Sequence, residues 1–135
     1  MSDQETELED ISYALTGEEL RSTLTLGDQD RFTYFIDKSK AEDQVWTLGV
    51  EEELIVLAGP EDTPFIVVFP HPEFAQEWIE GTDIEEVELV ALSAADMADH
   101  VLPSLQEEGI RVSVFPTSEK DGREVDASEL AKSLV

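Results

Sequence analysis

The chain has 135 residues, 41% of them hydrophobic, which is enough to bury the core of one domain without metals or crosslinks. It has no cysteine, so disulfides, thiolate catalysis and cysteine zinc sites are excluded. The 33 acidic and 8 basic residues give a formal net charge of −25, which disfavours binding to nucleic-acid phosphates and anionic membranes and favours basic partners.

Residues 1–24 are predicted to form an acidic N-terminal extension that is partly helical. The first ten residues hold five acids and no base, the opposite of the positively charged start of a signal peptide. Thr16 to Glu19 fits a capping box for one helix, and apolar residues at helical spacing predict another before it: Leu8, Ile11 and Leu15. No apolar run approaches the roughly 18 residues that cross a bilayer, so we expect a cytoplasmic protein without membrane contact.

Residues 25–135 are predicted to form a single α+β domain that begins with a helix over residues 26–42. Thr25 and Asp28 give this helix a capping start. Apolar residues spaced i, i+3 and i+4 give it one buried stripe, made of Phe32, Phe35 and Ile36. Its charged side chains are expected to face water: Arg31, Asp37, Lys38 and Lys40.

Three strands are predicted next, at residues 44–48, 54–58 and 65–69, with turns between them. The third strand, FIVVF, is apolar on both faces, as is typical of a central strand that is covered on both sides. Short connections favour antiparallel neighbours. The acidic cluster Glu51–Glu53 is interpreted as an exposed turn, since it lacks the alternating ligand spacing of a calcium loop.

The stretch FPHPE joins the third strand to a helix. Pro70 ends the strand and Pro72 suits the first position of a helix, which places His71 at the N-cap. Glu73 then lies in the first turn, where the helix dipole favours an acid. The helix is predicted to end at Gly81, and its apolar stripe consists of Phe74, Ala75, Trp78 and Ile79.

Two more strands, at residues 87–92 and 110–115, are separated by a helix. That helix is predicted to end at Gly109 and to kink or restart at Pro103, because a proline inside a helix removes one hydrogen bond and clashes with the preceding turn. The second of these strands alternates apolar and polar residues, so one of its faces is expected to be wetter.

The end of the chain is predicted to be a turn over residues 118–124 and a last helix. Asp126 caps this helix, and Leu130 and Leu134 share its buried side. The order of elements predicts an α+β fold in which about five strands form a largely antiparallel sheet, with a mixed sheet as the alternative. Four or five helices are expected to flank this sheet.

Motifs for known chemistry are missing from the sequence. It contains neither of the glycine loops that bind phosphates, no G-x-S-x-G and no H-E-x-x-H. A serine–histidine–acid arrangement would need His71 or His100, and His100 is expected to be an ordinary surface residue. His71 and Glu73 are two residues apart, but no third ligand follows at a recognisable spacing. We therefore expect no metal site, no cofactor and no enzymatic activity.

His71 remains the residue with two interpretations. It lies beyond a central strand at the start of a helix, the place where open α/β sheets commonly bind ligands. The alternative is a structural elbow in which two prolines fix the backbone and the histidine caps the helix. If the corner binds a ligand, Glu73, Trp46 and Trp78 are the other candidate binding residues, although the tryptophans also fit the core or half-exposed lids.

Four stretches in this order, DRFTYFIDK, VWTL, VVFPHPEFAQEW and LPSLQEEGIRVSVFPT, resemble a family of small bacterial proteins known as domain of unknown function 2750. The resemblance covers roughly residues 25–135. It implies a small cytoplasmic α+β protein with no assigned activity, so no functional residue is carried over. The shared pattern includes the corner at His71, which a common fold alone would explain.

Three functions remain open from the sequence. The first is a non-enzymatic interaction or accessory protein that binds a basic protein, for which charge would give fast and salt-sensitive association. The second is a small-ligand binder or enzyme that uses the corner around His71. The third is an acidic domain adapted to high salt, in which the charge serves no partner, because salt screens the self-repulsion.

Overall fold

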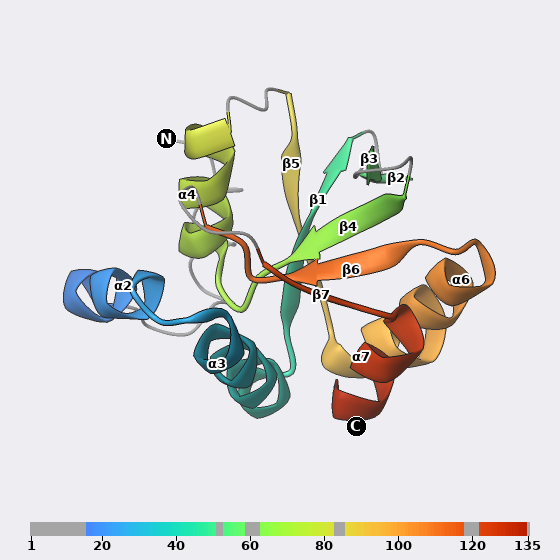
Figure 1. The fold of residues 1–135 in the computed structure, drawn as a ribbon, viewed down its shortest axis with the longest axis horizontal. Coiled ribbons are helices and arrows are strands. Elements are labelled where there is room, and N and C mark those ends of the chain that lie inside the picture. The colour runs from blue at the N-terminus through green and yellow to red at the C-terminus, as the bar shows by residue number, and fades with distance from the viewer. Residues whose placement is uncertain (1–15, 51–52, 59–62, 83–85, 118–121, 135) are drawn as a thin grey trace.

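The computed structural model describes residues 16–50, 53–58, 63–82, 86–117 and 122–134. In chain order, the described elements are α2 (Gly17–Leu24), α3 (Asp28–Glu42), β1 (Val45–Val50), β2 (Glu53–Leu54), β3 (Leu57–Ala58), β4 (Pro64–Val68), α4 (Pro72–Thr82), β5 (Glu88–Leu92), α5 (Ala94–Asp96), the π-helical segment η2 (Met97–Val101), α6 (Leu102–Glu107), β6 (Arg111–Val114), β7 (Arg123–Val125) and α7 (Ala127–Leu134). Because α5, η2 and α6 follow one another without a break, the described part has five helices. The predicted α+β class is confirmed (Figure 1).

The strands form two small sheets that meet at one point. One sheet has the order β2-β1-β5 and the other has the order β3-β4-β6-β7. An antiparallel bridge between Trp46 and Phe69 joins them, and Thr47 Oγ1 donates a hydrogen bond of 2.6 Å to the carbonyl of Val67. Strands β4 and β6 pair in parallel, whereas the other described pairs are antiparallel. The pairing is therefore largely antiparallel with one parallel pair, the mixed alternative of the prediction, but the seven described strands form two sheets and not the single sheet of about five strands that was predicted.

The parallel pair is a consequence of the chain between β4 and β6. Helix α4, strand β5 and the helix from α5 to α6 separate the two strands, and parallel neighbours need a long crossover of this kind. In Figure 1 β4 and β6 run side by side near the middle of the molecule, while α6 and α7 lie together at one end. The carboxyl ends of β4 and β6 consequently lie at the same edge of the sheet.

Two predicted segments differ from the structure. The predicted strand at residues 54–58 is divided into β2 and β3, because β2 pairs with β1 whereas β3 pairs with β4. The predicted turn at residues 118–124 contains the start of β7, whose pairing with β6 overrides the local turn signal. The predicted helix through Leu8 to Leu15, and most of the predicted turns at 51–53 and 59–64, lie outside the described residues.

Helix α2 begins as predicted, whereas α3 does not. Thr16 Oγ1 accepts a 3.0 Å hydrogen bond from the backbone N–H of Glu19, which caps α2. The N-cap of α3 is Gly27, which has no side chain to cap with, and Thr25 instead donates its hydroxyl to the carbonyl of Ser22. The predicted capping of α3 by Thr25 is wrong because Thr25 closes the end of the preceding helix.

The predicted disturbance at Pro103 is confirmed as a π-helical segment. In η2 the hydrogen bonds skip one more residue than in an α-helix, and the N–H of Leu102 donates to the carbonyl of Met97. Regular helix resumes in α6, with the proline in its first turn. Gly109 ends α6 with a φ of 72°, and the N–H of Ile110 donates to the carbonyl of Leu105 at 2.9 Å, as in a Schellman motif.

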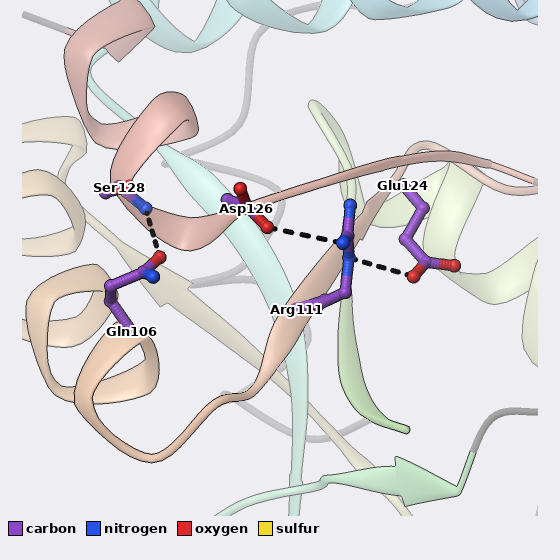
Figure 2. A network of polar contacts seen from close by, with 5 residues as sticks. All are labelled: Gln106, Arg111, Glu124, Asp126 and Ser128. Carbon is purple, nitrogen blue, oxygen red and sulfur yellow. Dashed lines mark hydrogen bonds and ion pairs between the residues drawn. The ribbon is translucent and has the colours of Figure 1, made fainter. Parts of the chain in front are cut away.

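Polar contacts join α7 to α6 and to β6 (Figure 2). Gln106 Oε1 accepts a 3.0 Å hydrogen bond from the N–H of Ser128 and so caps α7 from another helix. Asp126 precedes α7 as predicted, and its carboxylate lies 3.3 Å from Arg111 Nη1. Glu124 Oε1 lies 2.9 Å from Arg111 Nε, close enough for an ion pair although not aligned for a hydrogen bond. The apolar side of α7 is buried as predicted, with Leu130 and Leu134 in the core.

Candidate functional site

His71 caps α4, as the sequence predicts. Its Nδ1 accepts a 3.1 Å hydrogen bond from the backbone N–H of Glu73, and its carbonyl accepts from the N–H of Phe74 at 3.2 Å. The side chain is 5% exposed and its ring meets that of Phe74 edge to face, with 6.3 Å between the ring centroids. Because Nδ1 accepts a hydrogen bond, it carries no proton in this arrangement.

Replacement of His71 by alanine is expected to lower the free energy of unfolding by about 1–2 kcal/mol, because the cap bond is lost. Asparagine at the same position keeps an acceptor that can reach the helix N–H, so His71→Asn is expected to lose clearly less. Urea unfolding followed by tryptophan fluorescence measures both variants. Equal losses would show that packing of the imidazole, and not the cap, is what stabilises this corner.

The two candidate tryptophans belong to the core. Trp46 is completely buried in β1, and Trp78 is 8% exposed on α4. Phe69 connects them, since it pairs with Trp46 across the strand bridge and its ring centroid lies 6.0 Å from that of Trp78. The indole N–H of Trp46 has no acceptor among the described residues. Packing in the core between the sheet and α4 is sufficient to explain both side chains.

The four candidate binding residues therefore differ in how far solvent reaches their side chains. Trp46, His71 and Trp78 are buried, and only Glu73 is exposed. A ligand approaching from solvent would meet Glu73 alone unless the corner rearranged. The geometry favours the elbow, although the binding role of these residues stays a prediction.

Arg31, which was predicted to face water, is completely buried in α3. Its Nε donates a 3.1 Å hydrogen bond to the carbonyl of Phe115, and its Nη1 donates a 2.6 Å hydrogen bond to the carbonyl of Leu26. The buried positions of α3 are Arg31, Phe35 and Ser39, at a spacing of four residues. The prediction took Phe32 and Ile36 as the centre of the buried face, although both are only half-buried. The buried face is in fact centred on Phe35, and Arg31 lies on it.

Phe115, at the end of β6, has the left-handed φ of 55° that bulky residues rarely adopt. Its N–H donates to the carbonyl of Val68 at 2.8 Å, while its carbonyl accepts from Arg31. The ring is buried against Phe74, with 4.7 Å between centroids, and Tyr34 packs beside both rings. Contacts on every side of Phe115 thus hold a backbone conformation that costs on the order of 1–3 kcal/mol.

We call Arg31 with the carbonyls of Leu26 and Phe115 the Arg31 clasp. It joins the start of α3 to the end of β6, at the sheet edge where β4 also ends in the His71 corner. In many α/β proteins this edge binds a ligand. Here Arg31 donates hydrogen bonds to two carbonyls of the protein itself, and His71 accepts one from the backbone of α4.

A concave feature lies away from the His71 corner, between β2 and the helix formed by η2 and α6. We call it the β2–α6 cleft; its volume is about 580 Å³. Apolar side chains from three elements and the segment after β2 line it, namely Leu54, Val56, Val101, Leu105 and Ile110. The remaining lining residues are Glu53, His100, Ser104 and Glu108. His100 is exposed, as expected for a surface residue, and sequence reasoning did not select any part of this cleft.

Neither a cluster of metal ligands nor a membrane-spanning helix occurs in the described residues. Within them, no three histidine, aspartate or glutamate side chains gather closely enough to hold a metal ion. None of the helices in the described ranges is both long enough and apolar enough to span a bilayer.

Comparison with known proteins identifies the family. A search of curated proteins and a search of solved structures gave no match. The family model described as "Protein of unknown function (DUF2750)" matches residues 32–134, which is well over half of the chain. The matched range includes His71 and Phe115 and begins one residue after Arg31. The chain belongs to the DUF2750 family.

Proposed function

We propose that this protein is a non-enzymatic interaction protein of the cytoplasm that binds a basic protein partner. The observation that carries the proposal is the net charge of −25. The absence of cysteine agrees with a reducing compartment. A surface with so strong a field raises the rate at which a protein of opposite charge associates.

The tertiary structure makes the surface more negative than the composition suggests. Arg31, one of the 8 basic residues, is buried, and Arg111 is engaged with Glu124 and Asp126. Exposed carboxylates, in contrast, occur on each described helix, for example Glu18, Asp37, Glu80, Asp99 and Glu129. A basic partner would therefore find negative potential on several faces.

Adaptation to high salt is the competing explanation, because acids are spread along the whole chain. The two explanations differ in what happens at low salt. If the charge serves a partner, circular dichroism is expected to show the complete fold at low KCl. The melting temperature should then rise by only a few degrees towards molar KCl, since 1 kcal/mol corresponds to about 4 °C in a domain of this size. A chain that folds only in molar KCl would support salt adaptation and contradict the proposal.

The partner itself is sought by capture on immobilised protein from a lysate of the source cells at low salt. A matrix carrying poly-glutamate at the same charge density is the matched control. We expect a basic protein that the chain retains in stoichiometric amount, that poly-glutamate does not retain, and that higher salt releases. If every retained protein also binds poly-glutamate, the interaction is unspecific and the proposed function fails.

A further inference from the structure

One wall of the β2–α6 cleft consists of apolar side chains that do not belong to the hydrophobic core. Leu54 and Val56 both line the cleft, whereas Ile55 and Leu57 pack against the core. Val56 is 46% exposed, and of the described large apolar residues only it and Val50 are classed as exposed. This alternation places one apolar pair at the molecular surface.

The opposite wall is one face of a helix. Val101, Ser104 and Leu105, with Glu108 at the C-cap of α6, follow the spacing i, i+3, i+4 and i+7, which places them on one side of this helix. Leu105 is buried, while Glu108 is exposed. The cleft volume of about 580 Å³ lies within the range of about 300–1,000 Å³ that is usual for ligand pockets.

The charge around the cleft is negative. Glu53 and Glu108 line it, and no lysine or arginine does. Arg111, which follows the lining residue Ile110, does not line the cleft and is paired with Glu124 and Asp126. A second copy of this chain, with its own net charge of −25, would be repelled, as would phosphate groups.

We propose that the β2–α6 cleft is the docking site for the basic partner, and that its occupant is a segment that presents an aliphatic or aromatic side chain next to lysine or arginine. The apolar side chain enters between Val56 and Leu105, and the cation lies near Glu53 and Glu108. This inference rests on the proposed function and gives it a location. A few buried apolar contacts surrounded by polar ones are the usual source of affinity in such interfaces.

The test is an NMR titration of the labelled protein at about 50 mM salt, where charge attraction is still felt over 10 Å. The probes are three short peptides of equal length: lysine–leucine, lysine–serine and glutamate–leucine. We expect the lysine–leucine peptide to shift the amides of residues 53–56 and 100–110 and to bind at least about fivefold tighter than either control peptide.

Two variants separate the apolar from the electrostatic contribution. Val56→Ser is expected to weaken the lysine–leucine peptide by about fivefold to tenfold, the effect of exposing one valine side chain. Val50→Ser is its matched control, because Val50 is also exposed, at 41%, but does not line the cleft. Glu108→Gln is expected to weaken binding by about threefold. Its neighbour Glu107, exposed and outside the cleft, provides the control Glu107→Gln.

The outcomes distinguish the site from the function. If the lysine–leucine and lysine–serine peptides bind equally, with shifts spread over the acidic surface and no effect of Val56→Ser, the docking site is wrong while a basic partner remains supported. If the lysine–leucine peptide causes no shift in the cleft at all, the docking site is likewise wrong. The proposed function fails separately, through the capture experiment with its poly-glutamate control.

Discussion

Replacement of Arg31 by methionine is expected to lower the free energy of unfolding by about 3–5 kcal/mol. Hydrogen bonds to charged groups contribute about 1.5–3 kcal/mol each, and Arg31 donates two to backbone carbonyls. Methionine fills a similar volume, so the loss is expected to come from the carbonyls of Leu26 and Phe115, which lose their donor. Urea unfolding followed by the fluorescence of the buried tryptophans measures the change.

The control for this prediction is Arg21→Met on the preceding helix. Arg21 is exposed, and removal of an exposed charge usually changes stability by less than about 0.5 kcal/mol. Arg31→Lys tests the geometry, because a lysine ammonium is a single point that does not reproduce the fork of a guanidinium. A stability loss of Arg31→Met no larger than that of Arg21→Met would show that the Arg31 clasp does not hold the domain together.

Replacement of Gly122 by alanine is expected to destabilise the domain by about 2–3 kcal/mol, the cost of overpacking at a rigid site. An added Cβ would lie 2.5 Å from Ser113 Oγ, 2.8 Å from the carbonyl oxygen of Val114 and 2.9 Å from the nitrogen of Pro116. Two of these three atoms belong to the backbone around the end of β6, so rotation of a side chain cannot relieve the contact. The segment before β7 would have to move away from β6.

Gly27→Ala is the matched control for Gly122→Ala. An added Cβ at Gly27 meets nothing within 4 Å, and the φ of −70° is open to any residue. Both variants reduce the freedom of the unfolded chain equally, so the difference between them reports the contact at β6. We expect Gly27→Ala to remain within about 1 kcal/mol of the parent protein, as measured by urea unfolding. Similar stabilities for both variants would show that β7 adjusts without cost.

The fold class and most element positions could be predicted because they follow from local chemistry. The capping of α2 by Thr16 and of α4 by His71 needs only residues within one helical turn. The disturbance near Pro103 and the end of α6 at Gly109 follow in the same way from a missing N–H and from a left-handed backbone. Each of these features depends on the residue and its immediate neighbours.

The candidate site was harder to predict, because it depends on contacts between distant segments. His71 and Pro72 predict a corner from the sequence alone, but the sequence leaves open whether Trp46 and Trp78 lie in the core or form half-exposed lids, and only the fold buries them. The β2–α6 cleft joins residues near 54 to residues near 105, and no motif marks either side. Only the fold brings these two segments together.

Composition and hydrophobic periodicity are enough to predict a small α+β domain with a strongly anionic surface, because both can be read along the chain without knowing which distant residues meet. Where individual side chains lie depends on the fold, which buries the charged Arg31, pairs Arg111 with acids and exposes the apolar Val56. A hydrophobic pattern indicates only which face of an element is apolar. It cannot show that Arg31 is buried, because the carbonyl of Phe115 that accepts its hydrogen bond lies 84 residues away in the chain.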